Sequence, residues 1–217
     1  MNHRMFIVFE GVDGSGKSTQ IGEVEKAIRD WNKYQDIVLT REPTYKAIEV
    51  IKKLNEDTDP KKDASRMSNL FVNDRKVHYN NEILPDLLKN RVVICDRYSM
   101  STLAYQSTQG RQMQELIHAH IKVRIGVPDI TFYMALSTQQ AMERISKRGK
   151  KREKFEQFKF IEELVNRHEF IYNQSLEENS ISRLLGNVVR IDASREMGEV
   201  TKSILVELEP IYKEHTK

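Results

Sequence analysis

A stretch of eight residues near the N-terminus restricts the folds open to this chain more than any other part of its sequence. It has the pattern G-x-x-x-x-G-K-S and consists of Gly11, Val12, Asp13, Gly14, Ser15, Gly16, Lys17 and Ser18. An apolar run precedes it, and Thr19 and a stretch of helical character follow it. A strand, this loop and a helix in that order form a phosphate-binding loop. The chain is therefore predicted to bind the phosphates of a nucleotide.

Each part of this loop suits phosphate chemistry. The glycines let backbone N–H groups turn toward phosphate oxygens, and the N-terminus of the following helix adds a partial positive charge. Lys17 would reach the β and γ phosphates, and the Ser18 hydroxyl would ligate Mg²⁺. The loop alone does not distinguish a kinase from a GTPase, an ATPase motor or a sulfotransferase.

Short apolar runs are predicted to be β-strands, and longer amphipathic stretches separate them. The runs show little alternation, which indicates strands buried on both faces of a parallel sheet; they cover residues 5–9, 37–39, 92–95, 130–136 and 188–191. Apolar residues keep helical spacing over 155–172 and 197–211, and Ser137 with Gln140 is typical of a capping box. We therefore predict an α/β fold of the P-loop NTPase type, with a five-stranded parallel sheet flanked by helices in a single domain over residues 1–217.

Charged residues come at the ends of two predicted strands. Ligands of such a sheet bind at the carboxyl ends of its strands, which is where Arg41 and the pair Asp96-Arg97 stand. A guanidinium grips phosphate through two N–H groups, so both arginines are candidates for a second phosphate, with surface ion pairs as the alternative. Asp96 stands where a carboxylate would hold Mg²⁺ through water.

Phe71 and Arg75 lie four residues apart on a predicted helix and hence on one of its faces. An aromatic ring beside a guanidinium suits a planar base that carries exocyclic oxygens. The same spacing also fits a core phenylalanine and an arginine paired with a neighbouring carboxylate such as Asp74. The spacing leaves both interpretations open.

Taken in order along the chain, these residues and several others resemble the thymidylate kinase family over nearly the whole length. The matches are Phe9-Glu10-Gly11, Arg41-Glu42-Pro43, Leu70-Phe71 with Asp74-Arg75, Asp96-Arg97-Tyr98, then Ser101, Ala104, Tyr105 and Gln106, and finally Pro128-Asp129. The resemblance implies transfer of the γ-phosphoryl group of ATP to dTMP with Mg²⁺, in dTTP biosynthesis. It also implies a homodimer.

The resemblance further implies roles for individual residues. Phe71 would stack on thymine and Arg75 would bond its carbonyl edge. Arg41 and Arg97 would hold the dTMP phosphate, and Arg97 would also serve catalysis together with Lys17.

The sugar side of the pocket would be formed by four other residues. Asp13 would contact the sugar hydroxyl and help to position the phosphates, and Tyr105 would crowd the 2′ side and so disfavour ribose. Ser101 and Gln106 would line the base and sugar pocket.

The family takes a catalytic arginine either from the phosphate loop or from a mobile lid. Gly14 occupies the relevant position of the loop, so the lid is expected to supply the cation. We place the lid at about residues 146–158, where Arg148 and Arg152 are the main candidates and Lys151 and Lys154 are the alternatives. Taken alone, this basic run would also fit a solvated helix end or a nucleic-acid patch.

Other functional classes fit the sequence less well. A GTPase would need Asn-Lys-x-Asp after a later strand, whereas residues 32–35 lack the Asp and precede the second strand. The net charge of +3 is too small to indicate nucleic acid, so we expect only small-molecule substrates. The single cysteine, Cys95, is expected to be buried in a strand, excludes an intrachain disulfide and favours a cytoplasmic protein. No apolar stretch approaches the ~20 residues that span a bilayer, and no membrane partner is expected.

Overall fold

The computed structural model describes residues 4–54, 59–147 and 155–215. Within them, five parallel strands form one sheet in the order β2-β3-β1-β4-β5. The strands are β1 (Met5–Glu10), β2 (Ile37–Arg41), β3 (Val92–Asp96), β4 (Ile130–Ala135) and β5 (Asn187–Asp192). The predicted α/β fold with a five-stranded parallel sheet is confirmed, and Arg41 and Asp96 are the last residues of their strands.

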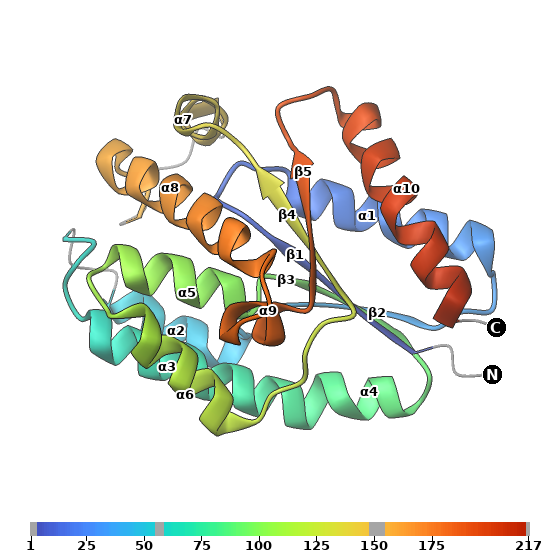
Figure 1. Ribbon diagram of the computed structural model, residues 1–217, viewed down its shortest axis with the longest axis horizontal. Coiled ribbons are helices and arrows are strands. Elements are labelled where there is room, and N and C mark those ends of the chain that lie inside the picture. Colours follow the sequence, from blue (N-terminus) through green and yellow to red (C-terminus); the bar gives the residue numbers. More distant parts are fainter. Residues whose placement is uncertain (1–3, 55–58, 148–154, 216–217) are drawn as a thin grey trace.

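Helices cover both faces of the sheet (Figure 1). On one face, α1 (Lys17–Trp31) and α10 (Met197–His215) lie side by side. The α7 helix (Thr138–Lys147) follows β4. The other side carries α2 (Tyr45–Leu54), α3 (Ala64–His78), the π-helix η1 (Tyr79–Ile83), α4 (Leu84–Leu88), α5 (Ser99–Thr108), α6 (Met113–Val123), α8 (Phe158–Ser175) and α9 (Ser180–Leu185).

The strands differ in burial according to their place in the sheet. β1 and β4 are buried along their whole length, and β3 is buried except at its last residue, Asp96. β2 and β5 are the edge strands and consist largely of half-buried and exposed residues. The prediction that every strand is buried on both faces was therefore wrong for these two, because an edge strand has a neighbour on only one side and is covered less completely.

Two predictions about helix starts had different outcomes. The capping box is confirmed, since the backbone N–H of Gln140 donates to Ser137 Oγ at 3.3 Å and the backbone N–H of Ser137 donates to Gln140 Oε1 at 3.4 Å. The helix predicted over 155–172 begins only at Phe158. Phe155 lies before it and packs edge-on against the Tyr105 ring, with 5.8 Å between ring centroids.

The pleat of β1 turns alternate residues of this strand into two different apolar clusters. In β1, Phe6 and Val8 belong to a cluster with Ile83, whereas Met5 and Ile7 belong to the larger cluster that contains Val24 of α1. Cys95 is buried, as predicted. Since all five strands are parallel, their carboxyl ends share one edge of the sheet, where the phosphate loop also lies.

Candidate active site

The phosphate loop joins β1 to α1, as the sequence predicts. Gly16 precedes α1 with φ of 88°, and Gly11 has φ of 138° with the place of a Cβ only 2.7 Å from the Met134 carbonyl oxygen. Both conformations favour glycine. Ser15 Oγ is buried and has no hydrogen-bond partner in the part of the chain that the structure describes. A buried hydroxyl without a protein partner is open to a phosphate oxygen.

Lys17 lies against the same loop. Its Nζ donates to the carbonyl oxygens of Gly11 and Val12 at 3.0 and 3.1 Å. Burial, followed by the positive charge of Arg97, lowers the pKa of the Lys17 amine to about 8. An anionic phosphate beside Lys17 would raise this pKa again and stabilise the charged ammonium. The lysine is therefore placed to bind a phosphate on the loop.

Ser18 and Asp96 form a small oxygen-rich group beside the loop. Ser18 Oγ donates to Asp96 Oδ2 at 3.3 Å, and Asp96 Oδ1 is buried without a hydrogen-bond partner among the described residues. A hydroxyl and a carboxylate with a spare oxygen suit Mg²⁺, which prefers oxygen ligands and keeps several waters.

Arg97 connects the phosphate loop to the space next to it. Its Nη1 donates to the Gly11 carbonyl at 3.1 Å and to Ser101 Oγ at 3.2 Å, while its Nη2 donates to Asp13 Oδ1 at 2.6 Å. The residue has φ of 74°, a conformation that is uncommon outside glycine. Tyr105 closes the group by donating to Asp13 Oδ2 at 3.4 Å.

A cavity of about 350 Å³ opens beside this group. Its wall includes Asp13, which is part of the phosphate loop, and Arg97, which donates to Gly11 and Asp13 of that loop. The wall includes every residue predicted to bind the acceptor substrate, namely Arg41, Phe71, Arg75, Arg97, Ser101, Tyr105 and Gln106. The structure thus brings the predicted residues to one place, although they come from β2, α3, α5 and the loop after β3.

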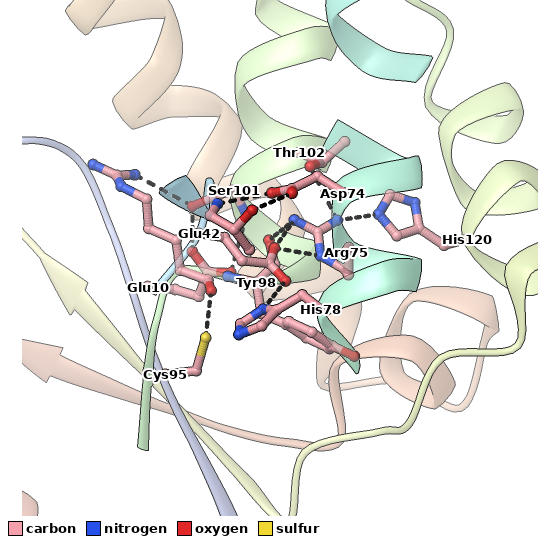
Figure 2. Close-up of polar contacts among 12 residues, drawn as sticks. Glu10, Glu42, Asp74, Arg75, His78, Cys95, Tyr98, Ser101, Thr102 and His120 are labelled. Carbon is pink, nitrogen blue, oxygen red and sulfur yellow. Dashed lines mark hydrogen bonds and ion pairs between the residues drawn. The ribbon is translucent and has the colours of Figure 1, made fainter. Parts of the chain in front are cut away.

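Arg75 is held rigidly in this wall. It is 1% exposed, and its Nε and Nη2 both contact Glu42 Oε2, at 2.7 and 2.6 Å. Nη1 donates to Thr102 and His120, and Nη2 also donates to the Tyr98 carbonyl (Figure 2). Each guanidinium nitrogen therefore has at least one protein acceptor, through four hydrogen bonds and a further ion-pair contact of Nη2 with Glu42. A carbonyl oxygen of a nucleobase bound beside Arg75 would therefore share an N–H group that already contacts a protein acceptor.

The carboxylate beside Arg75 is Glu42 and not Asp74, which the sequence suggested as a partner. Asp74 instead accepts hydrogen bonds from the backbone N–H and the hydroxyl of Thr44. Glu42 also contacts His78 Nδ1 at 3.1 Å, through its second carboxylate oxygen. Phe71 is half-buried and packs against the small cluster formed by Ala47, Ile51 and Met67.

Several residues of the site were not given a role from the sequence. Glu10, at the end of β1, accepts from the backbone N–H groups of Tyr98 and Ser101 and from the Ser101 hydroxyl, and burial raises the pKa of its carboxyl. Glu10 ends β1 just before Gly11, and Glu42 follows β2 just before Pro43. Their position at the carboxyl ends of strands is the sequence feature that could have indicated a role in the site. On α7, Arg144 donates to the Gly14 carbonyl at 3.4 Å.

His120 had no such signal. Its Nδ1 donates to the Leu116 carbonyl at 2.7 Å, so Nε2 is left to accept from Arg75. Burial, and then the charge of Arg75, lower the pKa of His120 to about 3, which keeps the ring neutral. The lid candidates Arg148, Lys151, Arg152 and Lys154 lie outside the described residues.

These features define the class of protein. It has a P-loop nucleotide-binding fold, and beside the phosphate loop it has a cavity with polar and apolar walls that would hold a second ligand. Residues 9–204 match the sequence model of the family described as thymidylate kinase. The chain belongs to the thymidylate kinase family.

Individual relatives agree with this assignment. A protein named thymidylate kinase from Caldicellulosiruptor saccharolyticus is 33% identical over 92% of this chain and 93% of its own length. One named probable thymidylate kinase from Pyrobaculum calidifontis is 35% identical over 94% of this chain and 96% of its own length. The crystal structure of thymidylate kinase from Ehrlichia chaffeensis superposes with a TM-score of 0.72 at 25% identity, covering 94% of this chain and 98% of that one.

Proposed function

We propose that this protein transfers the γ-phosphoryl group of ATP to the 5′-phosphate of dTMP, giving ADP and dTDP for dTTP synthesis. Membership of the thymidylate kinase family supports the reaction. The observation that carries the assignment of the sites is that two residues of the cavity wall also belong to the phosphate region: Asp13 is part of the phosphate loop, and Arg97 donates to Gly11 and Asp13 of that loop. A donor on the loop and an acceptor in the cavity would meet at these two residues.

The reaction depends more on neutralising the charges of the two phosphate groups than on acid–base catalysis. An oxygen of the dTMP phosphate attacks the γ-phosphorus of ATP, and the bond to the β-γ bridging oxygen breaks as ADP leaves. The attacking oxygen is already anionic, so no strong general base is needed. Lys17 would neutralise the donor phosphates, while Arg97 and Arg41 would hold the acceptor phosphate against their repulsion.

The cavity wall offers complementary groups for the rest of dTMP. Phe71 supplies an aromatic face for the base, and Arg75 and Gln106 supply polar groups for its edge. Tyr105, whose ring lies under the Arg97 guanidinium at 5.3 Å, would crowd the 2′ position of the sugar. Ser101 would contribute to the same wall, and its hydroxyl is kept in place by Glu10.

Ser18 and Asp96 are the residues that would hold Mg²⁺, for which the spare Asp96 oxygen and the neighbouring hydroxyl are the support. When bound, the ion would neutralise charge on the donor phosphates. The lid arginines Arg148 and Arg152 are proposed to add positive charge at the γ-phosphate; the family resemblance is the support for this role.

The test is ADP formation from ATP and Mg²⁺ with a panel of dTMP, dUMP, UMP, CMP, AMP and GMP as acceptors. We expect strong turnover with dTMP, weaker turnover with dUMP and little with the ribonucleotides. Equal or faster turnover with another monophosphate would overturn the assignment of the base pocket. A folded protein with no acceptor-dependent turnover would overturn the proposed reaction.

Two further proposals rest on the family resemblance. We expect a homodimer, which sedimentation equilibrium would test, and a cytoplasmic location, with which the single buried Cys95 agrees. No helix among the described residues is long and apolar enough to cross a membrane.

A further inference from the structure

Gln106 is a residue of the cavity wall whose side-chain oxygen has no hydrogen-bond partner among the described residues. The residue lies on α5, is 1% exposed and belongs to the lining of the cavity. Its Nε2 donates to Gln109 Oε1 at 3.0 Å, whereas its Oε1 is buried and has no hydrogen-bond partner in the described residues. A buried carbonyl without a partner is costly, which points to a ligand donor that completes it.

The orientation of this amide is decided three residues further along. Gln109 is 4% exposed, and its Nε2 donates to the Pro60 backbone carbonyl at 2.6 Å. A carbonyl can only accept, so Gln109 must turn its NH₂ toward Pro60 and its oxygen toward Gln106. Gln106 must then turn its own NH₂ toward Gln109. Gln106 thus donates to Gln109, Gln109 donates to Pro60, and the Gln106 oxygen is left as an acceptor without a donor.

We propose that Gln109 is a positioning residue that fixes the polarity of Gln106, so that the cavity accepts a pyrimidine with an N–H at position 3 and rejects one with a lone pair there. Thymine carries this N–H, whereas cytosine has an acceptor at the same atom. The inference rests on the proposed function, because it assumes that the base reaches Gln106. Gln109 touches neither the substrate nor the reacting atoms and acts through Gln106.

A merely structural role for Gln109 makes a different prediction. If the bond to Pro60 only ties α5 to the segment before α3, its loss would lower kcat/KM equally for every nucleotide that receives the phosphoryl group. If it sets the direction of the Gln106 amide, its loss would let that amide rotate and offer an N–H instead. Discrimination between the two bases would then fall, while the reaction itself would remain.

The experiment compares two substitutions at this position. Gln109→Leu removes both the donor and the acceptor in a similar volume. Gln109→Glu is the matched control, because its carboxyl group still accepts from Gln106 Nε2 and, when protonated, also donates to Pro60. The probes are dTMP and 5-methyl-dCMP, which differ only at position 3 and at the neighbouring exocyclic group. The readout is the ratio of their kcat/KM values, with circular dichroism and the KM for ATP as checks on folding.

We expect Gln109→Leu to lower the dTMP to 5-methyl-dCMP ratio by about tenfold or more, as for the loss of one oriented hydrogen bond. The loss should come from a higher KM for dTMP and a gain on 5-methyl-dCMP, and Gln109→Glu should keep the ratio within about twofold. A ratio unchanged in the leucine variant, or lowered equally in both variants, would overturn the inference. Gln109→Met carries the same expectation if the leucine variant does not fold.

The outcome separates this inference from the proposed function. Wild-type protein that forms no ADP with dTMP would refute the function. Normal wild-type turnover together with an unchanged ratio in Gln109→Leu would refute only the role of Gln109.

Discussion

The buried ion pair between Arg75 and Glu42 allows a quantitative prediction. The two side chains are 1% and 3% exposed, and Glu42 also accepts from His78. Replacing Glu42 with alanine leaves a buried guanidinium without its counter-charge and the His78 ring without an acceptor. Breaking a buried pair in this way costs about 3–5 kcal/mol of the free energy of unfolding. For a chain of this length that corresponds to a fall in Tm of roughly 6–20 °C.

Glu42→Gln should cost less, about 1–3 kcal/mol, because it keeps the shape and the hydrogen bonds. The amide oxygen can accept from Arg75 while the NH₂ donates to His78 Nδ1. His78 then carries its proton on Nε2 and donates it to Thr40 Oγ1, which lies 2.7 Å away. Only the charge is lost.

Thermal and urea unfolding of the two variants would measure these costs. Glu209→Gln is the matched control, since it breaks an exposed pair with Lys213 (42% and 63% exposed) and should cost about 1 kcal/mol or less. The expected order of destabilisation is Glu42→Ala, then Glu42→Gln, then Glu209→Gln. A Glu42→Ala protein as stable as the Glu209→Gln control would show that Arg75 does not depend on Glu42, and the reasoning would fail.

Three more predictions concern the site and the pH dependence of folding. Arg97→Ala should lower kcat by several orders of magnitude while leaving the circular dichroism spectrum unchanged; turnover near that of the wild type would remove Arg97 from the reaction. Tyr105→Ala should raise the kcat/KM for UMP relative to dUMP about tenfold or more, whereas Tyr105→Phe keeps the ring and should keep the preference, and equal behaviour of the two variants would contradict the steric role. Burial lowers the pKa values of His120 and His168 to about 3, below the 6.5 of an unfolded chain, so the unfolded state binds more protons between pH 6.5 and 3 and the free energy of unfolding falls as pH is lowered through that window. Urea titrations at several pH values should give His168→Leu a shallower slope than the wild type by about 1.4 kcal/mol per pH unit, and parallel slopes would mean that His168 is not buried as a neutral ring.

Much of the fold could be predicted because its signals are local. The phosphate loop is a continuous pattern, and the charged residues at strand ends lie next to the apolar runs that mark their strands. The parallel sheet followed from those runs, but the exposure of β2 and β5 did not, because only the order of strands in the sheet shows which of them are edges.

The missed residues depend on contacts between distant parts of the chain. Glu42 meets Arg75 across 33 positions, and His120 meets it across 45. Gln109 reaches Pro60 across 49 positions. Nothing in the residues around His120 or Gln109 distinguishes them from ordinary polar positions, so folding alone reveals that they contact Arg75 and Gln106 of the cavity wall.

The π-helix η1 also bears on how the chain length can vary. Leu84 donates its backbone N–H to the Tyr79 carbonyl, five residues back, so this turn holds one residue more than an α-helical turn. Before this turn, Arg75 lines the cavity, and at its last position Ile83 packs in a cluster with Phe6 and Val93 of the sheet. Deleting the exposed Asn81 would restore a regular helix and leave both faces in phase, whereas a deletion elsewhere would rotate the following residues by about 100°. Evolution can therefore add or remove one residue at this turn without uncoupling the cavity wall from the core.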